Sequence, residues 1–412
     1  MWVLATALAL VAAACAGTAN DDSGGNATTS TASPTSSQST TDEGSSTSSV
    51  PSQGNSSNLT FSVAEGWKAV SLGPGVKPAI AIDPSGAVGV TWLLEKIGEG
   101  FVAYATSGAD WDVETIREGY FYGPIGLAYE PDGTPNIIIH DHQADDFDPQ
   151  LGDLVRLFRD GSTWVEDIAS DPGHDGWDST VVIGDDGVIH AAGVDPAQFG
   201  STDGVEYYRN AGTGWEVTRV GSGPIPYQYN VALALDPTGS PSLTYYNDAD
   251  KDLIFAQLGG GSWNLETAAE EGDVGKYSSL AFGPDGQPAV TFFRQTGATS
   301  GEIVYATRGD GGWTQETIGQ LDAFSELNAR RNSSLAFDSQ GRPNVAFSDT
   351  EGAWYAVRGD SGWEIQQILE ADLPLGQLIS LALSEDDTPN IALYEVTQQQ
   401  PLDGSVAYLT TG

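Results

Sequence analysis

The stretch Ser278–Ile318 reads SSLAF, GPDG and QPAVTFF and then, after a short loop, EIVYAT, RGDGG and WTQETI. It contains four short runs that are rich in β-branched and aromatic residues. Clusters of glycine, proline and aspartate, which are typical of tight turns, separate these runs. The stretch therefore predicts four antiparallel strands joined in sequence order.

The same pattern recurs seven times along the chain. A tryptophan marks the turn into the last strand of each repeat, and successive tryptophans are 44 to 53 residues apart: Trp67, Trp111, Trp164, Trp215, Trp263, Trp313 and Trp363. A four-stranded sheet of this size cannot bury both of its faces alone, so sheets that repeat at this period must pack on one another. The sequence predicts an all-β fold, a seven-bladed β-propeller with four-stranded antiparallel blades.

The two ends of the repeat region complement each other. The last repeat has an innermost strand, a second strand and a third strand at Ser405–Thr410, and then the chain stops without a tryptophan strand. The missing strand is present at the other end, where Gly66–Val70 precedes the first complete repeat. Pairing of these N- and C-terminal strands in one blade would remove exposed sheet edges, and we expect the ring to close in this way.

Each repeat begins with an innermost strand that leads into a tight turn. The expected innermost strands are Ala79–Asp83, Gly126–Glu130, Thr180–Gly184, Ala232–Asp236, Ser279–Gly283, Ser334–Asp338 and Ser380–Ser384. Glycine holds the third position of six of the turns that follow, where a positive φ angle is expected. The seventh turn has Asp387 there, a residue that tolerates this conformation less well.

Composition and charge exclude one class of partner. The chain of 412 residues contains 51 glycines and 21 prolines, which suits a fold with many tight turns. Its 57 acidic and 16 basic side chains give a formal net charge of -41. Such a surface repels phosphate backbones, so no nucleic-acid partner is expected.

Residues 1–15 predict a signal peptide. Met1–Ala14 is apolar almost throughout and too short to span a bilayer, and it leads into the ending VAAAC with Cys15, the only cysteine. This ending resembles the lipobox of bacterial lipoproteins, which implies a lipid on Cys15 and an extracytoplasmic location at a bacterial cell membrane. The alternative is an ordinary cleavage site with an incidental cysteine.

The rest of the chain divides into two parts. Residues 16–59 are rich in serine and threonine and have almost no large apolar side chain, so they predict a disordered tether. Residues 60–412 are expected to form the propeller. We expect contact with the membrane through the lipid anchor only.

The turn before the tryptophan carries a second resemblance. Asp160–Trp164, Arg308–Trp313 and Arg358–Trp363 resemble degenerate Asp-boxes of sialidase-like (BNR) propellers. In that superfamily the box is structural and faces away from the active site. Seven repeats differ from the six of true sialidases and are more similar to seven-bladed bacterial propellers and propeller lectins. The resemblance implies a functional site on the face opposite the tight turns.

Longer and more varied connections are expected on that opposite face, and loops of this kind on a rigid scaffold usually carry function. Polar residues recur there at the ends of second strands, and aromatic and charged residues recur between repeats. The candidate ligand-binding residues are Asp141, His142, His174, Trp177, Tyr229, Asn247, Tyr277, Arg294, Arg331, Asp349 and Glu395.

Carboxylates, amides and aromatic rings around one funnel suit a polar, ring-bearing ligand such as a sugar. On this hypothesis, replacing Trp177 or Tyr277 by alanine weakens binding and leaves the melting temperature within a few degrees. The alternative is that the aromatic residues only pack the loops and the acids only face water.

The same face contains residues of two further site chemistries. Histidines and carboxylates between His140 and Asp148 suit a transition metal, but their spacing matches no standard site, so no metal or other cofactor is predicted; calcium binding is not readable from the sequence. A sialidase-like site needs three converging arginines, and only Arg294, Arg330 and Arg331 are suitably placed. No catalytic residue is predicted.

The sequence thus favours a monomeric, lipid-anchored propeller at the cell surface that binds an extracellular carbohydrate or protein ligand without catalysis. A sialidase-like glycoside hydrolase or another propeller enzyme is the first alternative. A scaffold for a protein assembly in the cell envelope is the second.

Overall fold

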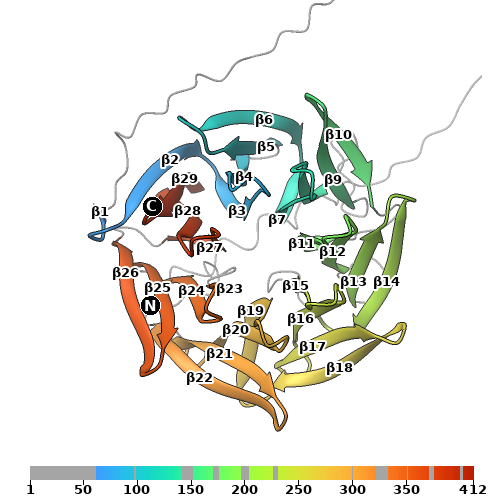
Figure 1. Cartoon of the computed structure of the whole chain (residues 1–412), viewed down its shortest axis with the longest axis vertical. Coiled ribbons are helices and arrows are strands. Elements are labelled where there is room, and N and C mark those ends of the chain that lie inside the picture. Colours follow the sequence, from blue (N-terminus) through green and yellow to red (C-terminus); the bar gives the residue numbers. More distant parts are fainter. Residues whose placement is uncertain are drawn as a thin grey trace, which may run out of the picture. The chain divides into compact units, whose positions relative to one another are not determined.

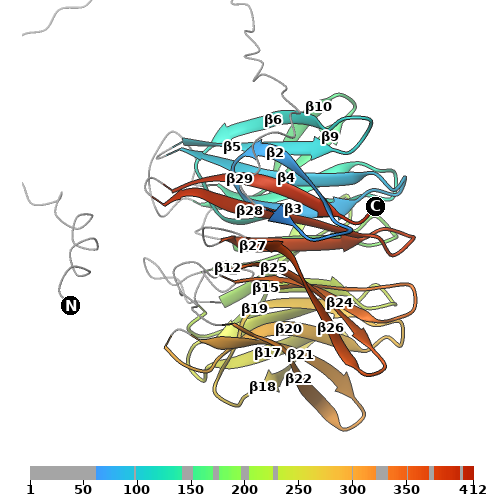
Figure 2. The same ribbon diagram turned by 90° about the vertical axis from the view of Figure 1, so that its left-hand side faces the viewer.

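A computed structural model of the protein describes residues 62–96, 99–141, 152–169, 176–195, 204–225, 231–298, 300–321, 333–349, 351–370, 375–399 and 402–412. They belong to one of the two units into which the chain divides, Ser52–Gly412. Their strands form seven sheets arranged in a ring, seen along its axis in Figure 1 and edge-on in Figure 2. The prediction of an all-β, seven-bladed propeller with four-stranded antiparallel blades is confirmed.

Blades 1 to 3 each consist of four consecutive strands, named here from the centre of the ring outward. Blade 1 contains β3 (Val76–Ile82), β4 (Val88–Lys96), β5 (Glu99–Thr106) and β6 (Asp112–Gly119). Blade 2 contains β7 (Phe121–Tyr129), β8 (Pro135–Asp141), β9 (Asp153–Asp160) and β10 (Thr163–Ile168). Blade 3 contains β11 (Trp177–Ile183), β12 (Ile189–Asp195), β13 (Gly204–Asn210) and β14 (Trp215–Ser222).

Blades 4 to 6 follow the same order. Blade 4 contains β15 (Val231–Leu235), β16 (Pro241–Asn247), β17 (Asp252–Gly259) and β18 (Ser262–Ala269). Blade 5 contains β19 (Asp273–Phe282), β20 (Pro288–Gln295), β21 (Gly301–Gly309) and β22 (Gly312–Leu321). Blade 6 contains β23 (Ser333–Phe337), β24 (Pro343–Ser348), β25 (Gly352–Gly359) and β26 (Gly362–Glu370).

The closing blade joins the two ends of the repeat region. It contains β27 (Leu375–Leu383), β28 (Pro389–Gln399) and β29 (Leu402–Thr410), and its outermost strand is β2 (Lys68–Pro74). Lys68 lies opposite Thr410 and Pro74 opposite Ser405, so the expected pairing of N- and C-terminal strands is confirmed. One strand was not predicted: β1 (Ser62–Val63) pairs with the outer edge of β26 and makes blade 6 five-stranded.

The core lies between the blades. Every residue of β8 and of β12 is buried, because a second strand has a neighbouring blade on both faces of its sheet. Outer strands alternate instead, and their outward side chains include Val113 and Leu265, which are 46% and 47% exposed. Burial is therefore highest in the second strands and lowest in the outermost strands.

The repeated tryptophans hold neighbouring blades together. At six interfaces the indole packs edge-on against a ring on the third strand of the preceding blade, with centroids 4.9 to 5.5 Å apart. The ring pairs are Tyr104–Trp164, Tyr207–Trp263, Phe255–Trp313, Tyr305–Trp363, Tyr355–Trp67 and Tyr408–Trp111. Edge-to-face contact is the geometry that aromatic quadrupoles favour. The periodic tryptophans are thus a packing feature of the fold.

Several innermost strands are longer than expected. The sequence placed Trp177 and Tyr277 in connections between repeats, but they lie in β11 and β19. A β-bulge lets these strands continue, and Asp178 and Tyr277 take positive φ angles of 52° and 57° within or beside the bulges. This corrects the loop assignment.

The tight turns behave as predicted. Gly286 and Gly341 have φ angles of 76° and 75°, and Asp387 adopts the same conformation at 65°. The Asp387 carboxylate accepts hydrogen bonds from the backbone N–H (2.7 Å) and the hydroxyl (2.6 Å) of Ser339 in the neighbouring turn. These bonds offset the cost of a positive φ angle in a non-glycine residue.

The described residues contain strands and no helix, and so no helix long and apolar enough to cross a membrane.

Candidate functional site

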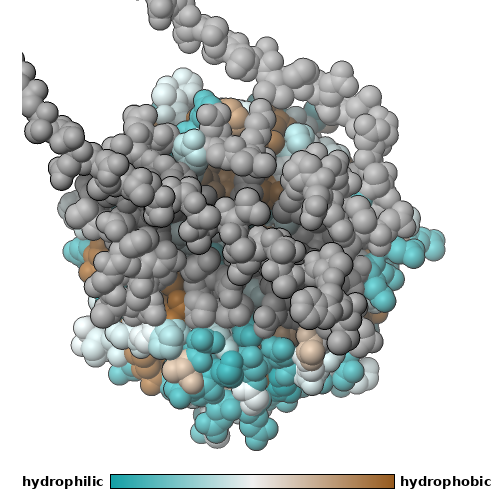
Figure 3. Space-filling view, turned by 180° about the vertical axis from the view of Figure 1, so that it is seen from behind, coloured by the Kyte–Doolittle hydropathy of each residue, from teal (hydrophilic) through white to brown (hydrophobic). Residues whose placement is uncertain are grey.

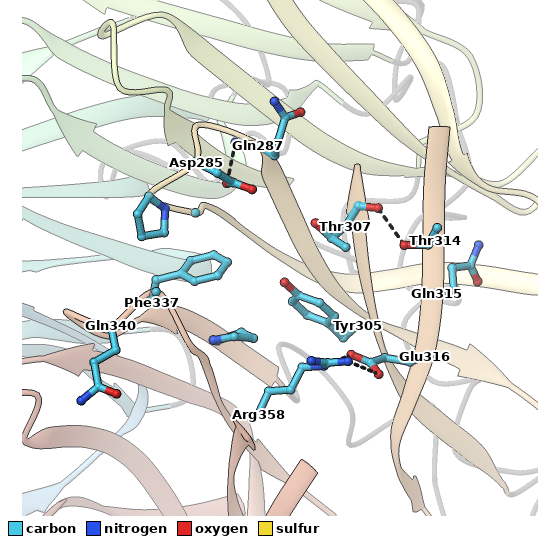
Figure 4. Close-up of a pocket in the computed structure, with 14 residues that line it drawn as sticks. Asp285, Gln287, Tyr305, Thr307, Thr314, Gln315, Glu316, Phe337, Gln340 and Arg358 are labelled. Atoms are coloured by element: carbon cyan, nitrogen blue, oxygen red, sulfur yellow. Dashed lines mark hydrogen bonds and ion pairs between the residues drawn. The ribbon is translucent and has the colours of Figure 1, made fainter. Parts of the chain in front are cut away.

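A pocket of about 560 Å³ opens between blades 5 and 6 on the face that carries the tight turns (Figure 4). Its volume falls in the range of small-molecule sites. We call it the blade 5/6 pocket. Its lining residues are Gly283, Pro284, Asp285, Gln287, Tyr305, Thr307, Thr314, Gln315, Glu316, Phe337, Gln340, Gly341, Pro343 and Arg358.

Strand alternation brings the polar side chains to one place. Tyr305 and Thr307 are two residues apart on β21 and so lie on the same face of the sheet. Glu316 lies opposite Tyr305 on β22, and Arg358 comes from β25 of the next blade. Figure 4 shows the Tyr305 hydroxyl pointing to the middle of the pocket, between Phe337 and Thr307.

Arg358 and Glu316 form a bidentate ion pair across the blade interface. Arg358 Nε lies 2.5 Å from Glu316 Oε1 and Nη2 lies 3.3 Å from Oε2. The hydrogen bond to Glu316 is the main reason that the pKa of Arg358 lies above its usual value. The pair gives the pocket a donor fork and a carboxylate acceptor in a fixed geometry.

The same ion pair recurs at two other interfaces with one difference. Glu114 binds both Arg159 and the indole N–H of Trp164, and Glu266 binds both Arg308 and the indole N–H of Trp313. At the blade 5/6 interface the corresponding indole is Trp363, whose buried Nε1 has no hydrogen-bond acceptor among the described residues. The oxygens of Glu316 therefore keep acceptor capacity that the two other carboxylates use for tryptophan.

Tyr305 supplies a neutral hydroxyl. The side chain is 7% exposed and its ring packs against Trp363 at a centroid distance of 5.4 Å. Burial raises the pKa of Tyr305 to about 12, with the Thr307 hydroxyl acting in the opposite direction. The phenol thus stays protonated at neutral pH and can both donate and accept a hydrogen bond.

A second pocket of about 570 Å³ opens on the same face between the closing blade and blade 1. We call it the closing-blade pocket. Its lining residues are Pro84, Ser85, Gly86, Ser384, Glu385, Asp386, Thr388, Asn390, Tyr408, Thr410 and Gly412. Tyr408 and Thr410 hold the positions of Tyr305 and Thr307 in the repeat, but the Tyr408 hydroxyl donates to Asn390 Oδ1 at 2.6 Å.

Of the residues predicted from the sequence, none that the structure describes lines either pocket. Asp141 ends β8, is 1% exposed and lies 2.6 Å from Arg117 Nη1 on blade 1. Arg294 forms an ion pair of 3.3 Å with Glu302 inside blade 5. These two charged side chains lie in structural ion pairs.

Three other predicted residues lie at or near the ends of second strands. Asn247 is the last residue of β16, and Glu395 lies inside β28 and is 4% exposed. Asp349 follows β24 and accepts the backbone N–H groups of Glu351 (2.8 Å) and Gly352 (3.0 Å). Burial raises the pKa of Asp349, although these hydrogen bonds lower it.

The predicted aromatic residues Trp177 and Tyr277 are 8% and 1% exposed. The Trp177 ring packs on His140 at 4.8 Å, and the Tyr277 ring lies 6.3 Å from Phe293. Truncation of such core rings costs about 3–5 kcal/mol. The expectation that alanine at either position leaves the melting temperature within a few degrees assumed exposed loop residues, whereas both rings are buried, and a larger fall is now expected.

The predicted residues Cys15, His142, His174, Tyr229 and Arg331 lie outside the described residues. Within the described ranges, no group of three or more His, Cys, Asp or Glu side chains is placed to hold a metal ion.

The face opposite the tight turns is shown in Figure 3, and its described part is hydrophilic over blades 4 and 5. Exposed acids here include Asp250, Glu270 and Glu271. Burial and the neighbouring charges of Asp250 and Glu270 raise the pKa of Asp252. This acidic surface differs from the blade 5/6 pocket, where a guanidinium balances the carboxylate.

Sequence reasoning missed the pocket because it assigned a purely structural role to the tight-turn face. A usable signal was present: Arg308 and Arg358 precede a tryptophan by five residues, and Glu266 and Glu316 follow one by three. Comparing the repeats position by position would have brought Glu316 and Arg358 together.

No family model matches the chain, and no curated protein does so. Among solved structures, the chain is similar to an α-L-arabinofuranosidase from Fusarium graminearum in complex with an iminosugar inhibitor, at 13% identity and a TM-score of 0.51. The match covers 70% of this chain and 96% of that one. The same source's complex with arabinobiose matches at 12% identity and a TM-score of 0.50 over the same shares of the two chains.

The chain is also similar to a fucose-complexed lectin variant from Aleuria aurantia, at 17% identity and a TM-score of 0.47, over 71% of this chain and 94% of that one. Propellers with similar folds thus include a carbohydrate-binding lectin and glycoside hydrolases. At these identities the likeness shows the fold alone.

Proposed function

We propose that this protein is a carbohydrate-binding propeller that binds without catalysis and is held at a bacterial cell surface by a lipid on Cys15. The observation that carries the binding part is the blade 5/6 pocket. It combines the Arg358–Glu316 ion pair, the Tyr305 hydroxyl and the ring of Phe337 in a cavity of about 560 Å³.

The chemistry of this pocket suits a polyhydroxylated ligand. Sugar hydroxyls both donate and accept, and the pocket offers acceptors on Glu316, a phenol on Tyr305 and amides on Gln287 and Gln340. The C–H faces of a sugar ring can pack on Phe337, a contact that contributes roughly 1 kcal/mol beyond area burial. With few contacts of this kind, dissociation constants in the micromolar to millimolar range are expected.

The two carboxylates of the pocket support binding over hydrolysis. Glycoside hydrolysis generally uses two carboxyl groups on opposite sides of the scissile bond, one of which must donate a proton. Glu316 is held by the guanidinium of Arg358, and Asp285 Oδ1 accepts the backbone N–H of Gln287 at 3.0 Å within its own turn. Both are placed as hydrogen-bond acceptors.

The cell-surface part of the proposal rests on the sequence. The apolar start, the single Cys15 and the serine- and threonine-rich residues 16–59 are the pattern of an anchored protein on a tether. At about 5–6 Å times the square root of its length, a tether of some 44 residues has a root-mean-square reach of roughly 35 Å.

A glycan array tests the binding part, with Arg358→Leu and the matched control Arg308→Leu. Arg308 forms the same ion pair, with Glu266, at an interface where Phe255 replaces the pocket tyrosine. Each variant loses a half-exposed ion pair that contributes at most about 1 kcal/mol to the free energy of unfolding. We expect Arg358→Leu to lose array binding at least tenfold while Arg308→Leu keeps it.

Two results would contradict the proposal. If the wild-type protein retains no glycan on the array and none from cell-envelope polysaccharide, it does not bind carbohydrate. If it releases sugar from a bound glycan, the hydrolase alternative replaces the non-catalytic one.

A further inference from the structure

The repeat position of Tyr305 is occupied by tyrosine in five blades. Tyr104, Tyr207, Tyr355 and Tyr408 are its counterparts, since each lies opposite the residue that comes three places after a repeat tryptophan. Comparison of these five positions shows what is different about the blade 5/6 pocket.

In four of the blades, a side chain holds the tyrosine hydroxyl. Tyr355 donates to Asn344 Oδ1 and Tyr408 donates to Asn390 Oδ1. Tyr207 lies 2.5 Å from His190 Nδ1. These partners all come from one position of the second strand of the same blade.

Blade 1 reaches the same result by another route. Its residue at the second-strand position is Gly89, and the Tyr104 hydroxyl lies 2.8 Å from the hydroxyl of Tyr129 on blade 2. A Cβ added at Gly89 would lie 1.8 Å from that Tyr129 oxygen, so glycine makes the room for it. The hydroxyl is again held by a protein side chain.

Blade 5 has neither of these two hydrogen-bond partners. The residue at the second-strand position is Ala289, which is 1% exposed and has only a methyl group, and the residue corresponding to Tyr129 is Phe337. Both of these residues are apolar, so among the described residues the Tyr305 hydroxyl, which lines an open pocket, has beside it only the Thr307 hydroxyl of its own strand. Tyr408 has the equivalent Thr410 and also Asn390, so the asparagine is the partner that blade 5 lacks.

We infer that Ala289 determines the binding competence of the blade 5/6 pocket, because it leaves the Tyr305 hydroxyl available to a ligand, and that the ligand is a neutral sugar. This inference rests on the proposed function and names the ligand class of the same site. Trp363 also differs from its repeat counterparts, because its Nε1 has no hydrogen-bond acceptor among the described residues. The Glu316 carboxylate, which lines the same pocket, therefore keeps acceptor capacity for a ligand.

The preference for a neutral sugar follows from charge. Arg358 is already paired with Glu316, and Asp285 adds a further carboxylate to the lining. The pocket therefore carries a net negative charge on a chain whose formal net charge is -41. Uronic and sialic acids would be repelled, whereas neutral hydroxyls can bind the phenol and the carboxylate.

The decisive variant is Ala289→Asn, which copies the residue that blade 6 and the closing blade have at this position. Asn344 Nδ2 donates to the carbonyl of Arg342 at 2.8 Å, and Asn390 Nδ2 donates to that of Thr388 at 2.9 Å. The matching carbonyl in blade 5 belongs to Gln287, which receives only the N–H of Gly283 in the turn. The Nδ2 of an asparagine at position 289 can thus donate to the Gln287 carbonyl, and its Oδ1 would accept a hydrogen bond from the Tyr305 hydroxyl.

The probes are methyl α-L-arabinofuranoside, methyl β-D-galactopyranoside, methyl α-L-fucopyranoside and the anionic methyl glycoside of N-acetylneuraminic acid, titrated by saturation-transfer NMR. We expect wild type to bind at least one neutral probe better than the anionic one. Ala289→Asn and Tyr305→Phe should each weaken this binding roughly three- to tenfold, the range expected for one hydrogen bond. The double variant should lose no more than either single one, because both act on one hydroxyl.

Asn390→Ala is the control, since it changes the closing-blade pocket and not this one, and it should leave binding unchanged. Equal binding by wild type and Ala289→Asn, or tighter binding of the anionic probe, would overturn the inference and leave the proposed function standing. If wild type binds none of the probes and no glycan on the array, both fail. If Ala289→Asn does not fold, the binding of Tyr305→Phe and Tyr408→Phe is compared instead, and only Tyr305→Phe should bind the neutral probe more weakly than wild type.

Discussion

Trp67→Ala tests whether the N-terminal segment closes the ring. Trp67 is 7% exposed, its ring packs against Tyr355 of blade 6 at 5.5 Å, and its Nε1 donates to Gln366 at 3.2 Å. The following strand, β2, pairs with β29 in the closing blade. One side chain therefore links the segment before the closing strand to blade 6.

The expected loss follows from burial. Truncation of a buried tryptophan to alanine lowers the free energy of unfolding by about 3–5 kcal/mol. At about 2 cal/mol/K per residue over roughly 350 residues, the entropy of unfolding is about 0.7 kcal/mol/K. The melting temperature should therefore fall by about 4–7 °C.

Differential scanning calorimetry on the full chain measures this shift, with Leu265→Ala as the control. Leu265 is 47% exposed on an outer strand, so its truncation should move the melting temperature by less than about 1 °C. Deletion of residues 61–72 removes β1, Trp67 and most of β2, and should destabilise the protein further. If Trp67→Ala behaves like the control, or the deletion variant is as stable as wild type, the closure is not what stabilises the ring.

Three further predictions concern pH, packing and location. Burial raises the pKa of Tyr245 and Tyr305 from 10.0 to about 12, so as the pH rises the unfolded chain loses these protons before the folded chain does. The free energy of unfolding should therefore stay constant below pH 10 and fall between pH 10 and 12. Tyr305→Phe should make this fall smaller in melting temperatures measured over a pH series. Gly89→Ala should lower the free energy of unfolding, measured with urea, by about 1–3 kcal/mol, because the added Cβ would clash with the Tyr129 hydroxyl. Adding Tyr129→Phe to this variant should restore part of the loss. An unchanged unfolding midpoint in Gly89→Ala would contradict the packing described. Wild-type protein should fractionate with cell membranes, whereas Cys15→Ser should be released or remain unprocessed; soluble wild type with an unmodified N-terminus would refute lipidation.

The fold could be predicted because the pattern that specifies it is local and repeated. The tryptophan of each repeat and the turn glycines at a fixed offset depend on strand geometry alone, and both are readable one repeat at a time. Even Asp387, an exception to the turn pattern, adopts the φ angle that its position requires.

The missed elements depend on contacts between residues distant in sequence. Asp178 and Tyr277 carry no glycine signal for the positive φ angle that continues their strands, so the predicted strands begin later than the observed ones. The pairing of β1 with Glu370 and Leu369 joins residues about three hundred positions apart and leaves no local pattern in Ser62–Val63.

The pocket escaped for a related reason. Glu316 and Arg358 belong to different blades and meet only when the ring is assembled. The informative residue, Ala289, is unremarkable in a strand and becomes informative only beside its counterparts His190, Asn344 and Asn390. The pocket can be found only by comparing the repeats position by position.

A crystal structure of the protein soaked with the neutral methyl glycoside that binds best in solution tests the central claim most directly. The account predicts sugar density between blades 5 and 6, in hydrogen-bond contact with Tyr305 and Glu316 and packed on Phe337. Sugar density confined to the opposite face, beside Asn247 or Asp349, with this pocket empty, would contradict it.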